Sequence, residues 1–331
     1  MPDAPLNFPA GFLWGAATAA HQIEGNNVNN DWWPREHSGD ARIAEPSGDA
    51  CDSYHRYRED MTLLRDAGLG TYRFSIEWSR IEPEEGHVSR AAIDHYRRMV
   101  DTALELGVTP MVTLMHFTVP RWFAQDGMWR SPKAADRFAR FTELALPVLG
   151  DDVKWVCTVN EPNIAAMIAG GEDPANLVAY ALPAPDLQVA DTLLECHRRS
   201  REVLSGVGGV RSGWTVATQA FQAEPGCAEL AHEYGYRRDD WYPEAAAGDD
   251  ARRIDYTRGA LTGLHAAIED GVKVEGYLHW SLLDNFEWTS GYRPTFGLVA
   301  VDRATFVRTP KPSLGWLGRV AAANGLSPRQ A

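Results

Sequence analysis

Short apolar, β-branched runs alternate along the chain with longer segments whose apolar positions recur at helical spacing. The short runs predict six strands, near residues 12–18, 71–76, 109–115, 153–159, 212–218 and 274–280. The longer segments predict helices over residues 52–67, 90–106, 133–148, 188–205 and 255–269. Because strands alternate with helices, the pattern indicates an α/β protein with a parallel sheet and helices outside it.

The number of strands separates two architectures. A closed (β/α)8 barrel of the TIM type needs eight strands. An open doubly wound sheet could be made from six, but no glycine-rich phosphate loop follows the first strand, which disfavours a nucleotide-binding sheet.

Residues 26–50 are polar and form a long loop with Trp32 and Trp33, and loops of this length are usually functional or mobile.

A carboxylate follows directly where one strand stops. The buried run 153–159 leads into Asn160, Glu161 and Pro162, and the proline ends the strand pairing and fixes the direction of the chain. The carboxyl ends of the strands form the reactive face of parallel α/β barrels, so this position favours a functional acid. On this segment alone, a glutamate in a surface turn is the alternative.

Composition narrows the class of partner. The 331 residues carry a formal net charge of −13, and this negative field would repel nucleic acid and anionic membranes. We therefore expect a small or neutral ligand, no nucleic acid partner and no membrane partner. Twelve tryptophans suit a site that stacks the flat apolar faces of a ligand and hydrogen-bonds its edges.

The cysteines and the N-terminal segment indicate what metal or disulfide chemistry and what cellular location to expect. Cys51, Cys157, Cys196 and Cys227 show neither CxxC nor Cys/His spacing, so we expect neither a metal site nor a disulfide framework. The N-terminal segment has no basic leader, and no apolar run reaches membrane-spanning length. The expectation is a soluble, cytoplasmic protein.

Polar and aromatic side chains recur at the ends of the predicted strands. They are Gln22, Arg73, Glu77, His116, Asn160, Glu161, Trp280, Asp284, Asn285, Glu287 and Trp288. Amides, a histidine, acids and tryptophans on one rim are what a sugar site needs, because hydroxyls require polar partners and the C–H face of the ring requires an aromatic one.

Five ordered stretches are specific enough to indicate a family. They are FLWGAATAAHQIEG at 12–25, YRFSIEWSR at 72–80, LMHFTVP at 114–120, TVNEP at 158–162 and GYLHWSLLDNFEW at 276–288. Together they closely resemble glycoside hydrolase family 1, the β-glucosidases. The resemblance implies a single TIM-barrel domain over residues 1–331, hydrolysis of β-glucosides or related β-glycosides, and no metal or cofactor.

The resemblance also implies roles for individual residues. Glu161 would be the general acid/base, which protonates the leaving oxygen and later activates water. Asn160 would hydrogen-bond the 2-hydroxyl of the sugar, and Trp280 would stack beneath the ring. The remaining substrate-binding positions would be Gln22, His116, Glu287 and Trp288, with Trp122 beside the aglycone and Arg73 lining the site.

The family's second carboxylate, the nucleophile, has no counterpart in this chain. In the family it belongs to an (I/V)-T-E-N-G motif after the seventh strand, and that motif is absent here. Residues 244–250 resemble the family segment before the sixth strand, whereas residues 249–256 resemble the segment after the nucleophile loop. We infer an internal deletion with its junction near 244–256, which removes two βα units, on the order of 60–100 residues, and leaves about six.

The deletion has consequences for the charges of the site. In the family, the arginine at the position of Arg73 neutralises the nucleophile, so Arg73 would be left without an obvious partner, which is costly if it is buried. Glu161 would ionise more readily and be a poorer acid at neutral pH. Glu233, Glu244 and Asp249 are the local acids that could replace the nucleophile, although none follows a recognisable strand.

A six-stranded remnant also leaves two unpaired strand edges at the gap. We expect either a distorted closed barrel or a homo-oligomer that covers the gap. Three functions stay open from the sequence. They are a β-glycosidase of impaired activity, a non-hydrolytic sugar-binding protein, and a repurposed acid/base enzyme that acts on a non-sugar substrate.

Overall fold

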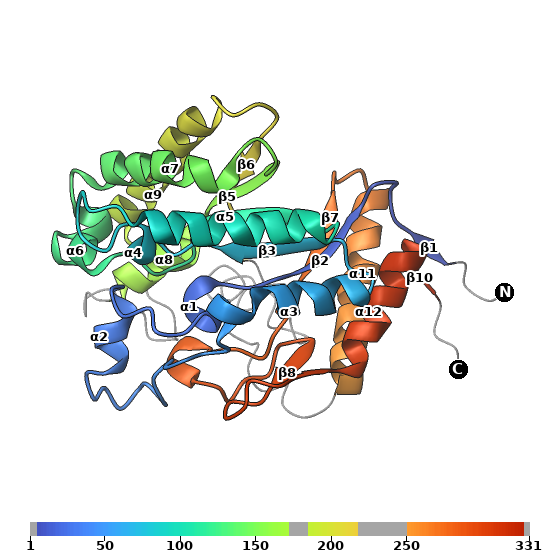
Figure 1. Cartoon of the computed structure of the whole chain (residues 1–331). Helices are drawn as coiled ribbons and strands as arrows, with labels where there is room; N and C mark the ends of the chain where they lie inside the picture. The colour runs from blue at the N-terminus through green and yellow to red at the C-terminus, as the bar shows by residue number, and fades with distance from the viewer. Residues whose placement is uncertain (1–4, 172–184, 218–249, 328–331) are drawn as a thin grey trace, which may run out of the picture.

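The central element is a six-stranded parallel sheet (Figure 1). The computed structural model describes residues 5–171, 185–217 and 250–327. The strands are β2 (Leu13–Ala17), β3 (Thr71–Ser75), β4 (Thr109–Met115), β5 (Trp155–Val159), β6 (Arg211–Gly213) and β7 (Gly276–Trp280). All six predicted strands are therefore confirmed, although β6 ends earlier than its apolar run suggested.

Helices connect these strands in the predicted order. The five predicted helices correspond to α3 (Ser53–Asp66), α5 (Arg90–Glu105), α7 (Ala134–Leu149), α9 (Leu187–Leu204) and α11 (Asp250–Glu269). The remaining helices among the described residues are α1 (Ala20–Ile23), α2 (Trp32–Glu36), α4 (Trp78–Ile81), α6 (Arg121–Gln125), α8 (Pro162–Gly170) and α12 (Pro312–Ala323), with the 3-10 turns η1 (Met128–Arg130) and η3 (Trp288–Ser290). Helix α2 interrupts the stretch predicted as one long loop.

Two small antiparallel sheets complete the described chain. Strand β1 (Leu6–Asn7) pairs with β10 (Gly325–Leu326), so the two ends of the domain lie side by side (Figure 1). Strand β8 (Val299–Val301) pairs with β9 (Arg308–Pro310). The first pairing ties the N-terminal segment to the residues that follow α12.

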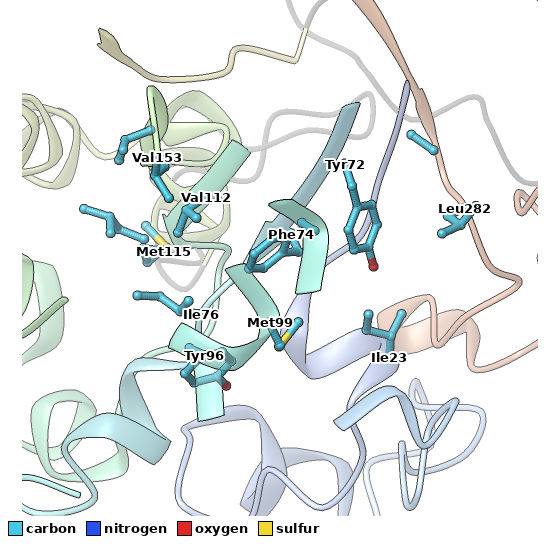
Figure 2. Close-up of a cluster of buried hydrophobic side chains, with 14 of the residues drawn as sticks. Ile23, Tyr72, Phe74, Ile76, Tyr96, Met99, Val112, Met115, Val153 and Leu282 are labelled. Carbon is cyan, nitrogen blue, oxygen red and sulfur yellow. The ribbon is translucent and has the colours of Figure 1, made fainter. Parts of the chain in front are cut away.

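The two faces of the sheet differ in character. Successive side chains of a strand point to opposite faces, and Tyr72 and Phe74 of β3 are buried in the same apolar cluster as Tyr96 and Met99 of α5 (Figure 2). Arg73 lies between them in the sequence and so projects from the opposite face. The helices therefore cover one face, and the other carries the polar groups of the site.

The sheet is open. Its strand order is β6-β5-β4-β3-β2-β7, with β6 and β7 at the two edges. The expected closed barrel is thus wrong for the strands that the structure describes, and the expected incomplete barrel of about six units is confirmed. Strand β6 pairs with β5 over three residues. Residues 244–249 of the inferred junction lie outside the described residues, and residues 250–256 begin α11.

Candidate functional site

Gln22 holds the loop after β7 through its side-chain amide. It lies in α1 and is fully buried, and its Nε2 donates to Asn285 Oδ1 (3.0 Å), to the carbonyl oxygen of Phe286 (2.8 Å) and to Glu287 Oε2 (3.2 Å). Three acceptors on one side fix the orientation of the amide. Oε1 therefore faces the other way, where it is buried without a partner in the described chain.

Glu287 is the acid of this group. It accepts a further hydrogen bond from Trp280 Nε1 (3.3 Å), and Trp280 is the last residue of β7. Burial raises the pKa of Glu287 to about 8, against the opposing effect of the hydrogen bonds from Trp280 and Gln22. Near pH 7 the carboxyl is therefore mostly neutral and can donate as well as accept.

His116 joins the same group through its ring. It follows β4 directly, and its ring stacks on Trp280 with centroids 5.4 Å apart and planes 14° apart. Burial and, to a lesser degree, the charge of Arg73 hold the pKa of His116 well below its usual range. The neutral ring leaves Nδ1 buried with no partner in the described chain.

Asn160 and Arg73 form the second half of the site. Asn160 Oδ1 accepts from Arg73 Nη2 (2.6 Å) and from Thr215 Oγ1 (2.9 Å), while Nδ2 is buried without a described partner. Arg73 is further held by Thr113, whose Oγ1 accepts from Arg73 Nε over 2.8 Å. Three neighbouring strands, β3, β4 and β5, thus position these groups.

Glu161 lies at the end of β5 in a constrained backbone. Its φ of +48° is uncommon for a residue with a side chain, and Pro162 begins α8 directly after it. The backbone N–H of Glu161 donates to Thr215 Oγ1 over 3.0 Å. Thr215 therefore contacts both Asn160 and Glu161. Sequence reasoning missed this residue because it lay inside a predicted strand without a motif of its own.

Trp288 is enclosed by other aromatic rings. It stacks on His21, with centroids 5.5 Å apart and planes 11° apart, and meets Trp32 and Phe117 edge-on at 5.1 Å and 5.7 Å. Phe117 in turn contacts the ring of His116 at 5.2 Å. His116 and Trp288, two of the predicted sugar-binding residues, are therefore joined by the ring of Phe117, a contact that the sequence did not reveal.

Trp122 lies in a different set of contacts. Its Nε1 donates to the carbonyl oxygen of Glu82 (3.0 Å), and its ring meets Trp78 edge-on at 5.7 Å. The guanidinium of Arg137 lies 5.4 Å from the ring centroid. No described contact joins Trp122 to Gln22, and its place beside the aglycone stays a prediction.

Two other strand-end acids have structural partners. Glu77 is buried and accepts from Thr118 Oγ1 over 3.0 Å. Asp284 forms an ion pair with Lys311 over 2.7 Å. Neither therefore joins the candidate site through these contacts.

The acids proposed as substitute nucleophiles cannot be placed. Glu233, Glu244 and Asp249 lie outside the described residues, as does Cys227.

Among the residues that the structure describes, no group of three or more His, Cys, Asp or Glu could hold a metal ion. None of the described helices is both long and apolar enough to cross a bilayer.

Three polar atoms define what the site can bind. Gln22 offers an acceptor, Asn160 offers a donor, and the neutral His116 offers one or the other, and all three atoms are buried without described partners. The aromatic ring of Trp280 lies against that of His116. A ligand with several hydroxyl groups and an apolar ring face would satisfy this combination.

Known proteins are similar to this one in sequence and in fold. The family model of Glycosyl hydrolase family 1 matches residues 5–174 and 230–326. β-Glucosidase A of Thermotoga maritima is 28% identical, over 96% of this chain and 98% of that protein. Thermostable β-glucosidase B of Thermobispora bispora is 30% identical, over 97% and 92% respectively. The solved β-glycosidase from Pyrococcus horikoshii has a TM-score of 0.85 and 28% identity, and the match covers 98% of this chain and 97% of that chain.

These relatives are longer than this chain. The alignment with the Thermotoga maritima protein has 447 positions, 116 more than the 331 residues here, so at least that many of its positions have no counterpart. The shortfall exceeds the 60–100 residues expected from two βα units. Since the family model matches well over half of the chain, this protein belongs to glycosyl hydrolase family 1, as a member with an incomplete barrel.

Proposed function

We propose that this protein binds the sugar ring of β-glucosides or related β-glycosides and hydrolyses them slowly. The observation that carries the proposal is the set of buried, unpartnered atoms, Gln22 Oε1, His116 Nδ1 and Asn160 Nδ2. Each such atom costs about 1–3 kcal/mol when buried unpaired. A bound sugar would supply the missing hydrogen bonds.

Glu161 would act as the general acid in this reaction. Its proton would pass to the glycosidic oxygen while the bond from that oxygen to the anomeric carbon breaks. Its place after β5, beside Asn160 and next to Thr215, supports this role. The position is the one that the family resemblance assigns to the acid/base.

The missing second carboxylate would make the reaction slow. A retaining glycosidase needs a nucleophile about 5–5.5 Å from the acid/base, and the family's motif for it is absent. The hydrogen-bond partners of Arg73 in the described chain are Thr113, Cys157 and Asn160, none of which is a carboxylate. Water would then have to attack without covalent catalysis.

Hydrolysis of two kinds of β-glucoside tests the role of Glu161. A nitrophenyl glucoside has a good leaving group and depends little on the acid, whereas an alkyl glucoside needs the proton. We expect Glu161→Gln to slow alkyl glucoside hydrolysis by about 10²-fold or more and aryl hydrolysis by much less. Glu143→Gln, a change at an exposed position of α7, is the matched control. Equal loss with both substrates would exclude Glu161 as the acid.

A sugar-binding protein without hydrolysis is the second candidate. It is favoured by the contrast between the filled sugar-binding positions and the absent nucleophile motif. Glucose binding in calorimetry without release of nitrophenol would select this candidate. Absence of both binding and turnover would leave Glu161 as an acid or base for a non-sugar substrate.

We also propose that a second copy of the chain covers the open edges of the sheet. Trp214 and Val216, which follow the edge strand β6, are 41% and 52% exposed, and exposed apolar groups beside a free edge favour association. A monomer in size-exclusion chromatography at micromolar concentration would contradict this association.

We propose that a single domain spans residues 1–331, with the deletion junction near 244–256.

A cytoplasmic location is part of the same proposal. The described cysteines Cys51, Cys157 and Cys196 are buried and free, which suits a reducing compartment. Recovery of the protein from an extracytoplasmic fraction of its source cells would contradict this location.

A further inference from the structure

Arg73 has unused hydrogen-bonding capacity on the polar face of the sheet. A guanidinium carries five N–H donors. Nε donates to Thr113 Oγ1 (2.8 Å), and Nη2 donates to Asn160 Oδ1 (2.6 Å) and, more weakly, to Cys157 Sγ (3.5 Å). The two N–H groups of Nη1 have no hydrogen-bond partner among residues 5–171, 185–217 and 250–327.

Two other sheltered arginines of this protein are paired with carboxylates. Arg80 pairs with Glu24 over 2.8 Å, and Arg308 pairs with Asp60 over 2.8 Å. Arg73 is likewise sheltered from water in part, yet its partners are a hydroxyl, an amide oxygen and a thiol. Within the described ranges, its charge is therefore not balanced by an ion pair.

The hydrogen-bond partners of Arg73 and the nearby His116 add a second free donor and no negative charge. Asn160 Oδ1 accepts from both Arg73 and Thr215, so the orientation of its amide is fixed. Nδ2 then points away from these donors, and it is buried without a described partner. His116 is neutral because burial and Arg73 lower its pKa well below the usual range. The described hydrogen-bond partners of Arg73 therefore supply no negative charge to balance its own.

We propose that Arg73 and the Nδ2 group of Asn160 bind a carboxylate of a ligand. A planar carboxylate accepts two N–H groups from one guanidinium and balances its charge. The carboxylate comes either from a small free acid or from an acidic sugar such as a uronic acid. This site shares Asn160 Nδ2 with the proposed sugar site, but it does not rest on the proposed hydrolysis, because neutral glucosides carry no carboxylate.

Calorimetric titration at pH 7 tests the site. Sodium acetate, D-glucuronate and D-glucose are titrated into the protein at constant ionic strength. We expect acetate or glucuronate to bind the wild type and to lose about tenfold or more in affinity in Arg73→Met. Arg58→Met is the matched control, since Arg58 is exposed and pairs with Glu105, and it should bind as the wild type does. Equal affinity in wild type and Arg73→Met, or no binding of either acid, would overturn the proposal.

A second variant covers the case in which Arg73→Met does not fold. Asn160→Asp keeps the arginine and places a carboxylate at the atom that now accepts from it over 2.6 Å. The internal carboxylate should abolish binding of the external one, and retained affinity would overturn the proposal. Glucuronate binding tighter than both acetate and glucose identifies an acidic sugar, whereas acetate binding undiminished by saturating glucose identifies a free acid. These measurements report binding and not hydrolysis, so each outcome can be interpreted even if the protein releases no nitrophenol.

Discussion

Arg211 forms an ion pair with Glu275 across the opening of the sheet. Arg211 is the first residue of β6, Glu275 immediately precedes β7, and these two strands are the edges of the six-stranded sheet. Arg211 also lies over the ring of Trp155, with its guanidinium carbon 4.1 Å from the centroid. The two edges are therefore linked at their amino ends by side chains, although no backbone pairing joins them in the described chain.

Removal of this ion pair should lower the stability of the folded protein slightly. We expect Arg211→Gln and Glu275→Gln each to lower the urea midpoint by a small amount at low salt. The double variant should lose less than the sum of the two, because both single variants remove the same ion pair, while Glu275 also pairs with Lys273 and Arg211 also contacts Trp155. Since both side chains are partly exposed, 1 M salt should abolish the difference. Urea unfolding at both salt concentrations measures it.

The exposed pair Arg42 and Asp40 provides the control for the opening. It lies within one loop and joins no two strands, so its removal should leave the urea midpoint unchanged at both salt concentrations. Additive losses from Arg211→Gln and Glu275→Gln would show that the ion pair does not link the edges.

Glu287 should make stability fall as the pH rises. Burial raises its pKa from 4.5 to about 8, so between these values the folded protein keeps a proton that the unfolded chain has released. The free energy of unfolding therefore decreases with rising pH in this window, by about 1.4 kcal/mol per unit at most. Above pH 8 this contribution should level off.

Glu287→Gln isolates this contribution. The glutamine cannot ionise, so the loss of stability from pH 5 to pH 8 should be smaller in the variant than in the wild type. Urea unfolding across this range measures both slopes, and Glu143→Gln on the exposed face of α7 should keep the wild-type slope. Identical slopes in wild type and Glu287→Gln would contradict the raised pKa.

His116→Phe should separate sugar binding from stability. The phenyl ring keeps the stack on Trp280 and removes a buried nitrogen that has no described partner. We expect stability to be unchanged or increased, because an unsatisfied polar atom is lost. Glucose affinity should fall about tenfold, because one hydrogen bond to the ligand is lost. Urea unfolding and calorimetry measure the two effects.

His95→Phe is the matched control for His116→Phe. Its ring stacks on Tyr54 at 3.7 Å, and its Nε2 is also buried without a described partner. It should therefore affect stability in the same direction and leave glucose affinity unchanged. A loss of glucose affinity in His95→Phe equal to that in His116→Phe would show that neither effect comes from the sugar site.

Thr215→Val should disturb the positions of Asn160 and Glu161 together. Valine keeps the shape of threonine but can neither donate to Asn160 Oδ1 nor accept from the N–H of Glu161. We expect about 1 kcal/mol of lost stability and a lower rate with alkyl β-glucosides. Thr215→Ser keeps the hydroxyl and should restore both properties. No recovery with serine would show that packing, and not the hydrogen bonds, is responsible.

Local signals in the sequence were enough to place the strands and the acid at the end of β5. The apolar run ends at Val159, and Pro162, which cannot pair in a sheet, begins α8 shortly after it. The same applies to Trp280 and His116, each of which lies at the end of a strand that its own apolar residues define. Apolar periodicity and proline determine backbone structure over a few residues, so strand ends can be predicted from them without knowing how the rest of the chain folds.

Contacts between distant segments were decided only by the tertiary structure. Thr215 reaches Asn160 and Glu161 from 55 and 54 positions away in the chain, and no local pattern marks such a partner. The stacking of Trp288 on His21 and the place of Trp122 beside Trp78 depend in the same way on how elements pack. The opening between β6 and β7 is the clearest case. The sequence by itself determined that six strands are present, but whether the edge strands meet depends on backbone pairing between segments far apart, which only the folded chain settles.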